Sequence, residues 1–350
     1  MRVLVTGAGG FIGSHVAKRA MESGQEVRGV VMPGEDSSLL ERLGAEVVVG
    51  DLLDPEVARR GVKGCEVVYN AVGRSTDYGS FDDLHRPNVL ATESVLKAAI
   101  EGGVRRFVHA SSYMVSMGGS FNYWRGGVIT ERTPESSRFW RWDYYSRAKI
   151  AAEQLLMKAQ GHIEVVPLRI GWVYGPRDRT SFPRLVDIVR SGNGLIIGNG
   201  QNCLGLVYVE DAANAFLLAG NQESPSGHPF LVSGVADEHL ITQAEYMNAI
   251  ADAIGARRPR LRVPFPVAVA LGTTMEAVWH GLRIKNPPLL TNFAVRLIGQ
   301  DCILDSSLAL SLLGWAPQMR FSEGMRHTLE WLERERAGTT IKDKNREHEA

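Results

Sequence analysis

The feature that most constrains the fold is a strand, a glycine-rich turn and a helix at the start of the chain. The apolar run 2–5 is followed by Gly7, Gly10 and Gly13, spaced G-x-x-G-x-x-G, and by a helix-periodic segment through Met21. In such a unit the first glycine permits the tight turn, the second lets the backbone approach a pyrophosphate, and the third lets helix and strand pack closely. The arrangement predicts a dinucleotide-binding unit within a parallel sheet.

The helix after this turn is expected to bind the pyrophosphate at its N-terminus, where the N–H groups around Phe11 and Ile12 and the helix dipole favour an anion. The next predicted strand, 26–31, should end beside the adenosine ribose, where an acid indicates NAD and an arginine indicates NADP. Met32 follows this strand, and Glu35 comes slightly later. Because no basic residue stands at the strand end, the sequence favours NAD and leaves NADP open.

Further cofactor contacts are predicted after the third and fourth strands. Asp51 and Leu52 follow the third strand, and Ala71 and Gly73 follow the fourth, where small residues would let a cofactor pass over the sheet edge. Asp51 is placed to accept a hydrogen bond from the adenine amino group. Capping of the helix that begins at Pro55 is an equally good interpretation of Asp51.

The alternation of strands and helices predicts an α/β protein with a Rossmann-type doubly wound parallel sheet. Six strands alternate with helices over 1–170, and from there the pattern loosens. We assign 171–204 and 226–336 to a smaller, mostly C-terminal α/β substrate-binding lobe, and we expect 205–225 to return to the sheet. The charged segment 337–350 has few apolar residues, so it is predicted to be a disordered tail.

The composition excludes several classes of partner and site. The 350 residues include 39 Lys and Arg and 39 Asp and Glu, so the overall charge gives no reason to expect nucleic acid or an anionic membrane. The cysteines, Cys65, Cys203 and Cys302, are too far apart for a disulfide framework or a metal site. With no signal peptide pattern at the start, we expect a cytoplasmic protein.

Ser112 is the first candidate catalytic residue. In open parallel sheets catalytic groups gather at the carboxyl ends of strands, and Ser112 follows the fifth predicted strand, 106–110. A serine in this position is often a helix cap, but the residues 113–115 that follow do not resemble a helix start. The sequence therefore favours Ser112 as a hydrogen-bond donor to a substrate oxygen.

Tyr145 and Lys149 form the second candidate, a Y-x-x-x-K pair in the predicted helix 143–160. Residues four apart lie on one helix face, so the Lys149 ammonium can lie beside the Tyr145 phenol. Lowering a phenol pKa from ~10 to near neutrality needs about 4 kcal/mol of preference for the phenolate, which an ammonium and a cationic cofactor could supply together. Chance produces many such pairs, so the assignment depends on the redox site around it.

Asn88 lies inside the predicted helix 81–102, where asparagine is unfavourable. It is therefore expected to have a tertiary partner, either in a structural bridge or in contact with a catalytic water.

A loop of about thirty residues separates Ser112 from Tyr145, and structureless loops of this length inside a domain are usually functional. Its aromatic side chains form either a local core or the wall of an apolar substrate pocket. They are Phe121, Tyr123, Trp124, Phe139, Trp140 and Trp142.

The apolar stretch 263–282 is too interrupted to span a bilayer, since it contains two prolines, Gly272, Glu276 and His280. It could be a core helix, an apolar lid or a surface for peripheral membrane contact. Core packing is the commonest fate of such a helix.

Together these pieces resemble an extended short-chain dehydrogenase/reductase of the NAD-dependent epimerase/dehydratase superfamily, over residues 1 to about 335. The motifs that carry the resemblance are T-G-x-x-G-F-I-G, G-D-L-x-D, N-A-x-G, S-S, Y-x-x-x-K, L-R-x-x-x-V-Y-G-P, V-Y-V-E-D and L-G-W. The resemblance implies that Tyr145 is the general acid/base and that Lys149 holds the nicotinamide ribose and lowers the tyrosine pKa. It also implies that Ser112 orients the substrate oxygen and that Asn88 supports a water connected to Lys149.

Within the superfamily, the 3β-hydroxysteroid dehydrogenase-like branch is more similar than the nucleotide-sugar branch, through 263–266, 287–291 and 330–332. Nucleotide-sugar enzymes usually place an arginine shortly before the V-Y-V-D-D run to pair with a diphosphate. This chain has Asn202 and apolar neighbours in that region, and loss of a bidentate phosphate partner is chemically serious.

The predicted function is therefore NAD(P)-dependent hydride transfer between the nicotinamide and a secondary alcohol or ketone of a lipophilic, sterol-like or other apolar substrate. The alternative is a nucleotide-sugar 4-epimerase or dehydratase with tightly bound NAD, and a minor alternative is a non-catalytic dinucleotide sensor. A homodimer is expected, with the helices 81–102 and 143–160 forming a four-helix interface.

Overall fold

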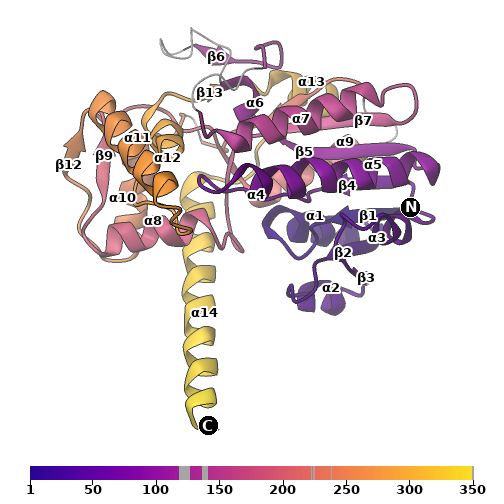
Figure 1. The fold of residues 1–350 in the computed structure, drawn as a ribbon, viewed down its shortest axis with the longest axis horizontal. Coiled ribbons are helices and arrows are strands. Elements are labelled where there is room, and N and C mark those ends of the chain that lie inside the picture. Colours follow the sequence, from indigo (N-terminus) through magenta and orange to yellow (C-terminus); the bar gives the residue numbers. More distant parts are fainter. Residues whose placement is uncertain (118–126, 136–140, 222, 224, 238, 349–350) are drawn as a thin grey trace.

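The computed structural model contains a larger lobe built on a twisted sheet and a smaller lobe beside it (Figure 1). The aromatic residues of the loop before Tyr145, apart from Trp142, lie outside the described residues. Of 338–348 only the backbone is described. The described residues are 1–117, 127–135, 141–221, 223, 225–237 and 239–348.

The larger lobe contains a parallel sheet of seven strands, in the order β11-β7-β5-β4-β1-β2-β3. The strand order reverses between β1 and β4, which is where ligands bind in sheets of this type. The predicted Rossmann-type fold is thus confirmed. The strands are β1 (Arg2–Thr6), β2 (Glu26–Val31), β3 (Glu46–Val49), β4 (Val67–Asn70), β5 (Arg106–Ser112), β7 (Glu164–Ile170) and β11 (Phe230–Val232).

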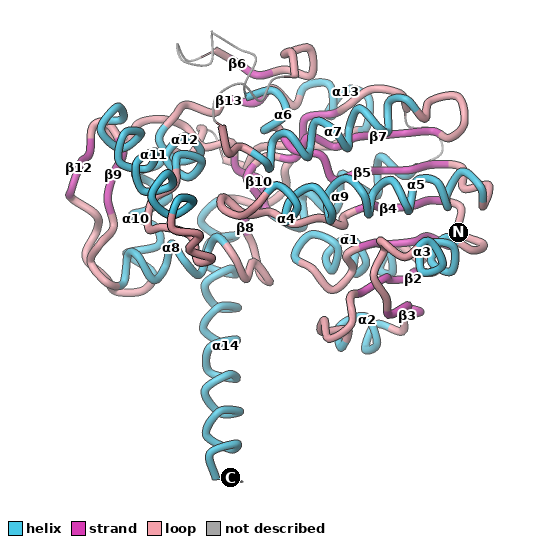
Figure 2. Tube along the Cα trace, viewed as in Figure 1, coloured by secondary structure: helices cyan, strands magenta, loops and turns pink. Residues whose placement is uncertain are grey.

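The central strands are apolar because both faces of the sheet are covered by helices, as is usual for parallel sheets. Val3, Leu4 and Val5 of β1 are fully buried, and β1 pairs with β2 and β4 in register, Val3 opposite Val27 and Val67. Figure 2 shows the strands as a layer with helices in front and behind.

Two hydrophobic cores fill the space between the sheet and its helices. One face is covered by α1 (Phe11–Glu22), α9 (Val209–Gly220) and α13 (Ser307–Leu313), with α2 (Ser38–Leu43) beside α1. The other face is covered by α3 (Pro55–Val62), α5 (Ala91–Glu101) and α7 (Tyr144–Lys158). The short helices α4 (Phe81–His85) and α6 (Met114–Met117) and the π-helical turn η1 (Arg86–Leu90) adjoin α7.

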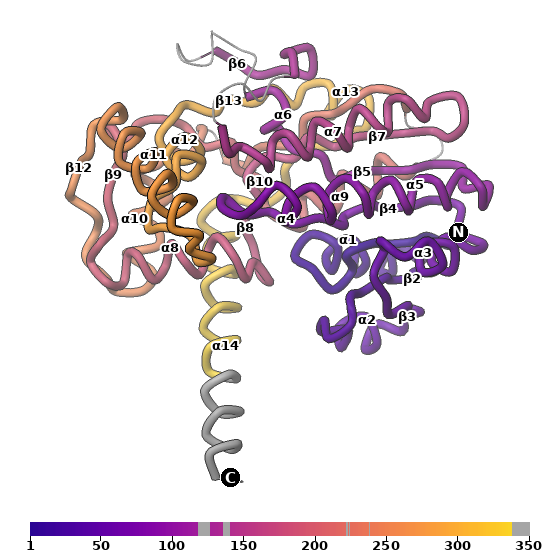
Figure 3. Tube along the Cα trace, viewed as in Figure 1, coloured from indigo at the N-terminus to yellow at the C-terminus, as the bar shows by residue number. Residues whose placement is uncertain are grey.

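The smaller lobe is built largely from residues 172–208 and 240–300, drawn in pink and orange in Figure 3. Its own hydrophobic core joins α8, α10 and the start of α14. Its two-stranded sheets are β8 (Trp172–Tyr174) with β10 (Leu206–Tyr208) and β9 (Leu195–Ile197) with β12 (Leu261–Val263). Its helices are α8 (Ser181–Arg190), α10 (Gln243–Ala253), α11 (Phe265–Gly281), α12 (Asn292–Gly299) and α14 (Phe321–His348). A third small sheet pairs β6 (Val128–Ile129) with β13 (Ile303–Leu304).

Two segments differ from the sequence-based assignment. The strand β11, placed in the substrate-binding lobe, pairs with β7 at the edge of the large sheet, because Phe230, Leu231 and Val232 are all fully buried there. Helix α14 continues to His348, through most of the segment predicted to be a disordered tail. That segment contains Lys, Glu and Arg, which are good helix formers even without an apolar face.

No helix in the described part of the chain is long and apolar enough to cross a membrane.

Candidate active site

The glycine-rich turn between β1 and α1 has a shape that only glycine allows at two positions. Gly7 adopts φ +60°, and a Cβ on it would lie 2.9 Å from the Ala71 carbonyl oxygen. A Cβ on Gly13 would lie 2.1 Å from the Gly7 carbonyl oxygen, so α1 contacts the turn directly. The turn and the end of β4 therefore lie side by side, as expected if both contact one cofactor.

The N-terminus of α1 fits an anionic group such as the cofactor pyrophosphate. Gly10 is its N-cap, no side chain caps the helix, and the first turn contains no acid, so the first N–H groups are available to a ligand. Arg177 reaches this turn from the loop after β8 and donates from Nη2 to the Gly9 carbonyl at 3.2 Å. The buried Nε of Arg177 has no hydrogen-bond partner, which leaves a donor for the same anion.

His15 connects α1 to the loop that carries Arg177. Its Nε2 lies 3.0 Å from the Pro176 carbonyl oxygen, and its ring meets Phe11 edge to face. Burial lowers the pKa of His15 to about 4, so the ring is neutral near pH 7. Phe11 and Ile12 are partly buried on α1, with Ile12 packed against the core. Sequence reasoning gave no role to Arg177 or His15, because both act through contacts distant in the chain.

At the adenosine end, Glu35 turns back toward the end of β2 and accepts a hydrogen bond from the Met32 amide at 3.0 Å. Its carboxyl carbon lies 2.9 Å from where a Cβ on Gly9 would be, so the acid lies over the glycine turn. Arg28 is buried, donates to the Gly61 and Lys63 carbonyls and pairs with Glu46. Glu35, which comes slightly after the strand end in the sequence, thus folds back beside the glycine turn.

Asp51 and Leu52 have different surroundings from those expected. Asp51 was a candidate cap for helix α3. The cap of α3 is Asp54 instead, whose side chain accepts a hydrogen bond from the Glu56 amide. Asp51 instead accepts from the Leu53 amide at 2.9 Å and is partly exposed. The Leu52 side chain is buried in the core under α3 and α5, so only its backbone can reach a cofactor.

Ser112 and Tyr145 are brought together by β5 and α7. The Tyr145 hydroxyl hydrogen-bonds with Ser112 and Ser75, and burial, which outweighs these bonds, raises the pKa of Tyr145. The sequence predicted that Lys149 lowers the pKa of Tyr145. In the folded chain alone, burial raises this pKa instead. A short helix, α6, does begin at Met114, and the Met114 amide donates to Ser112 Oγ at 3.3 Å. The expectation that no helix starts there was wrong.

Lys149 lies one turn after Tyr145, with Nζ 5.9 Å from the centre of the phenol ring. Nζ donates to the Ala110 carbonyl of β5 at 2.8 Å, and burial lowers the pKa of Lys149 to about 8. The buried His109 nearby is neutral, because burial holds its pKa well below its usual range. Lys149 therefore supplies a positive charge at neutral pH that weakens above pH 8.

Asn88 is buried in the π-helical turn η1, a form often found at functional sites. Its Nδ2 donates to the Leu84 and Arg74 carbonyls at 2.8 and 3.0 Å, whereas its Oδ1 has no hydrogen-bond partner. A Cβ on Gly73 would lie 2.5 Å from that Oδ1 and 3.5 Å from Lys149 Nζ. Gly73, Asn88 and Lys149 thus meet at one point, with an acceptor left open.

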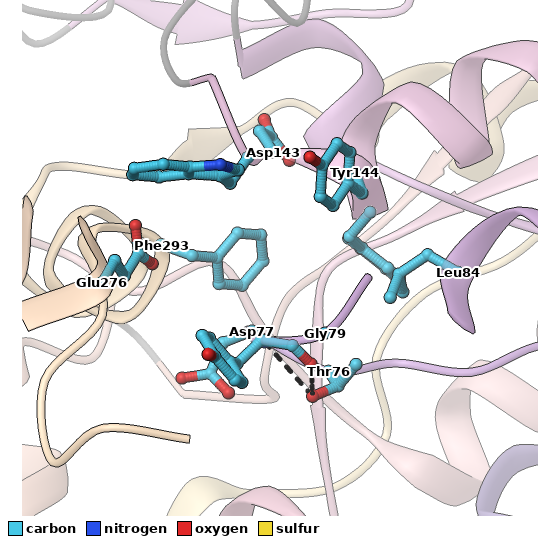
Figure 4. A pocket seen from close by; sticks show the side chains of 11 residues that line it. Thr76, Asp77, Gly79, Leu84, Asp143, Tyr144, Glu276 and Phe293 are labelled. Carbon is cyan, nitrogen blue, oxygen red and sulfur yellow. Dashed lines mark hydrogen bonds between the residues drawn. The ribbon is translucent and has the colours of Figure 1, made fainter. Parts of the chain in front are cut away.

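A small, half-open pocket lies beside Tyr145. In Figure 4 the Phe293 ring points to its centre, between Glu276 on one side and Tyr144 and Leu84 on the other. Phe293 also meets the Tyr145 ring edge to face, 5.9 Å between centroids. The pocket is lined by Thr76, Asp77, Tyr78, Gly79, Leu84, Trp142, Asp143, Tyr144, Tyr145, Glu276 and Phe293.

The three acids of the pocket wall are engaged within the protein. Asp143 caps α7 and accepts from the Ser146 amide, Asp77 pairs with Arg184 at 3.1 Å, and Glu276 accepts from the Asn292 amide at 3.1 Å. No lysine or arginine is among the described residues that line the pocket. Five of the eleven residues that line the pocket beside Tyr145 are aromatic.

A model of the NAD dependent epimerase/dehydratase family matches residues 3–233, about two thirds of the chain. The chain belongs to this family. The match covers the glycine turn, Ser112, Tyr145 and Lys149, and it ends just after the last strand of the large sheet. The predicted superfamily and an NAD cofactor are thus confirmed, and the glycine turn, the open N-terminus of α1 and Arg177 are the residues that would hold the pyrophosphate.

Relatives of known name are similar over nearly the whole chain. A 2-alkyl-3-oxoalkanoate reductase of Stenotrophomonas maltophilia is 27% identical, covering 93% of this chain and 98% of its own. A 3 beta-hydroxysteroid dehydrogenase/Delta 5-->4-isomerase of Mycobacterium tuberculosis is 29% identical, covering 90% and 86%. The solved structure of MoeE5 with UDP-glucose and NAD has a TM-score of 0.72 at 25% identity, covering 96% and 99%. The chain is an enzyme of the extended short-chain dehydrogenase/reductase type, which removes the non-catalytic sensor from the alternatives.

Proposed function

We propose that this family member is an NAD-dependent oxidoreductase that interconverts a secondary alcohol and a ketone on a lipophilic substrate. The observation that carries the proposal is the wall of the pocket beside Tyr145. Five of its eleven lining residues are aromatic, its three acids are engaged within the protein, and no described basic side chain lines it. An aromatic wall binds an apolar skeleton by burial of its surface. A nucleotide sugar would bring a diphosphate with no cation there to pair with it.

The segment before β10 supports the same substrate class. Asn202 lies in the region where nucleotide-sugar enzymes usually have an arginine, and its Nδ2 donates to the Ile298 and Gln300 carbonyls at 2.6 and 3.1 Å. These bonds join the end of α12 to the segment before β10, and the buried Oδ1 of Asn202 has no hydrogen-bond partner. The names of two relatives, a 2-alkyl-3-oxoalkanoate reductase and a 3 beta-hydroxysteroid dehydrogenase, describe keto and hydroxy groups on largely hydrocarbon skeletons.

In the proposed reaction, Tyr145 gives its phenolic proton to the substrate oxygen during reduction and takes it back during oxidation. Bound nicotinamide supplies or accepts the hydride. Ser112, which already hydrogen-bonds with the phenol, holds the substrate oxygen close to it. The raised pKa of Tyr145 keeps the proton on the phenol until a substrate arrives, and the positive charge of Lys149 stabilises the phenolate that forms.

The substrate class is tested by following NADH absorbance with ketones of increasing apolar size, and by thermal shift with UDP-glucose. We expect net NADH consumption that becomes more efficient as the apolar part of the ketone grows, and no stabilisation by UDP-glucose. Stabilisation by UDP-glucose, together with epimerised or dehydrated product and no net change in NADH, would establish the nucleotide-sugar alternative instead.

NAD rather than NADP is part of the proposal, because Glu35 lies over the glycine turn near the ribose position. A carboxylate there would accept hydrogen bonds from the ribose hydroxyls and would repel a 2′-phosphate. Titration of each cofactor against the enzyme, with tryptophan fluorescence as the signal, measures this preference directly.

A homodimer also remains part of the proposal. Helices α5 and α7 lie next to each other on the same face of the sheet, and α7 carries the exposed Arg147, Gln154 and Lys158 with partly exposed Ile150 and Leu155. Light scattering should give twice the chain mass, and Leu155→Glu should lower it. An unchanged mass in this variant would place the interface elsewhere.

A further inference from the structure

Helix α11 exposes its large apolar side chains and buries its small and charged ones. The residues of α11 that are buried are Ala268, Gly272 and Glu276, one turn apart on the inner face. Glu276 is the sole acid of this 17-residue helix and is 2% exposed. A helix that is apolar around its whole circumference is normally buried. This one is buried on one side only, where Ala268 packs with Ile197 and Val295, so core packing accounts for that side of 263–282 and leaves the opposite side exposed.

The exposed side chains of α11 form a narrow stripe. Val267, Leu271 and Val278 are 49%, 50% and 45% exposed, and Leu282 just after the helix is 67% exposed. At 3.6 residues per turn these positions fall within about 60° of the helix circumference. Large aliphatic groups gathered on one face of a protein mark an interaction surface.

The inner face of α11 is fixed to the smaller lobe, so the stripe does not serve as the underside of a lid. A Cβ on Gly272 would lie 3.0 Å from the Asn292 nitrogen, and Glu276 accepts from the same amide. His280 stacks between the rings of Tyr78 and Trp142, at 4.8 and 4.7 Å. Figure 1 shows α11 and α12 side by side on the outside of the smaller lobe.

The segment around α11 carries a strong excess of positive charge, although the whole chain has no net charge. Residues 253–300 contain seven Lys and Arg side chains and one acid, the buried Glu276. Arg260 and Arg262 are exposed before the helix, and Arg283 and Lys285 are exposed after it. In the described part of the chain, none of these four flanking cations forms an ion pair, whereas Arg258 pairs with Asp252. An apolar stripe with cations at both ends matches the surface of an anionic bilayer.

We propose that α11 docks this enzyme on anionic phospholipid bilayers, with the stripe of Val267, Leu271, Val278 and Leu282 inserted below the headgroups and the flanking cations contacting them. The opposite side of the same helix supplies Glu276 to the pocket beside Tyr145. Docking would therefore hold the helix that supplies this wall residue at the bilayer surface. The docking itself does not depend on the proposed function, since it is measured without turnover.

Vesicle flotation of the full chain tests the proposal with phosphatidylcholine alone and with phosphatidylcholine mixed with phosphatidylglycerol. We expect binding to the anionic vesicles, weakening as salt is added. Arg283→Gln with Lys285→Gln should lower partitioning by roughly fivefold for each cation removed. The matched control, Arg60→Gln on α3 with Lys63→Gln just after it, removes the same charge far from α11 and should leave partitioning unchanged. Failure of the wild type to float with anionic vesicles overturns the proposal.

The stripe is tested by Leu271→Glu with Val278→Glu, which should abolish flotation while leaving the melting temperature and the turnover of a water-soluble ketone unchanged. The control is Leu310→Glu, on α13, where the wild-type side chain is 56% exposed. Equal flotation of the two variants would overturn the assignment of α11. Quenching of wild-type tryptophan fluorescence by brominated lipid reports insertion without any substitution, because Trp279 lies on α11. A mass that halves in the stripe variant, with no flotation of the wild type, would show instead that the stripe joins two copies of the chain.

Discussion

The two ends of the active site are built in different ways. The nucleotide end is formed mainly by the backbone of one continuous segment, the turn at Gly7–Gly13 and the N-terminus of α1. The substrate end is formed by side chains from segments far apart in the sequence, including Tyr78, Trp142, Glu276 and Phe293. A backbone site needs only particular glycines at a fixed spacing, whereas a side-chain site needs the whole fold.

This difference explains which end of the site tolerates amino-acid substitutions. The turn has no room for other residues, because a Cβ at Gly13 would meet the Gly7 oxygen at 2.1 Å. The pocket wall can accept substitutions that keep the fold, since Trp142 and Phe293 are only partly buried. We therefore expect changes at the nucleotide end to reduce cofactor binding and changes at the substrate end to alter substrate choice.

The largest effect is expected for Tyr145→Phe, which removes the proton donor but not the ring. Turnover of the ketone should fall by roughly 10²–10⁴-fold, the usual contribution of positioned proton transfer, while the affinity for NAD stays the same. Stopped-flow kinetics and cofactor titration measure the two quantities separately. Wild-type turnover in this variant would show that the substrate end is not centred on Tyr145.

The second largest effect is expected for Gly13→Ala. Its Cβ forces α1 away from the turn, at a cost of about 1–3 kcal/mol, so the dissociation constant for NAD should rise roughly tenfold or more. Gly281→Ala is the control, because a Cβ there meets nothing within 4 Å. Isothermal titration measures both. If the two variants bind NAD equally well, the backbone of this turn does not hold the cofactor.

At the substrate end, Phe293→Ala should raise the KM for a large apolar ketone by about tenfold, since one aromatic ring of the pocket is lost. A small ketone that does not reach Phe293 is the internal control, and its KM should change little. Steady-state kinetics with both substrates checks this. An equal rise for the two ketones would mean that Phe293 acts by positioning Tyr145, not by binding the substrate.

Glu35→Gln should reduce the preference for NAD over NADP by several-fold, because a neutral amide no longer repels a 2′-phosphate. Asp36→Asn is the matched control, since Asp36 binds the Ser38 amide instead. Cofactor titrations with both dinucleotides measure the ratio of affinities. A ratio that changes as much in the Asp36 variant as in the Glu35 variant would remove the specific role of Glu35.

The smallest effect is a pH dependence of stability from His15. Burial lowers the pKa of His15 from 6.5 to about 4, so between these values the unfolded chain binds a proton that the folded chain does not. Stability should therefore be lost as pH falls through this window, by at most ~1.4 kcal/mol per pH unit. The free energy of unfolding, measured by urea unfolding at several pH values, should change less steeply with pH in His15→Gln, which keeps a donor for the Pro176 carbonyl. An identical slope in both proteins would show that His15 does not titrate in this way.

Some site residues could be predicted because the chemistry is local in the chain. Tyr145 and Lys149 lie on one helix, and Ser112 lies at the end of β5, so helix periodicity and strand order indicated them. Contacts of residues such as Arg177 could not be predicted, since nothing in the sequence around it shows that its loop folds over Gly9. The same limit applied to Leu52, which follows a motif strand but has its side chain in the core.

The sequence by itself determined the parallel sheet and the glycine turn, and it indicated Ser112, Tyr145 and Lys149 as candidate reacting side chains, because each depends on periodicity or spacing within about thirty residues. Only the tertiary structure decided the character of the pocket, the surroundings of the Tyr145 phenol and the exposure of α11. Burial raises the pKa of Tyr145, and Glu276 is buried. Both burials depend on how distant segments of the chain pack. That packing left the aliphatic side of α11 facing outward.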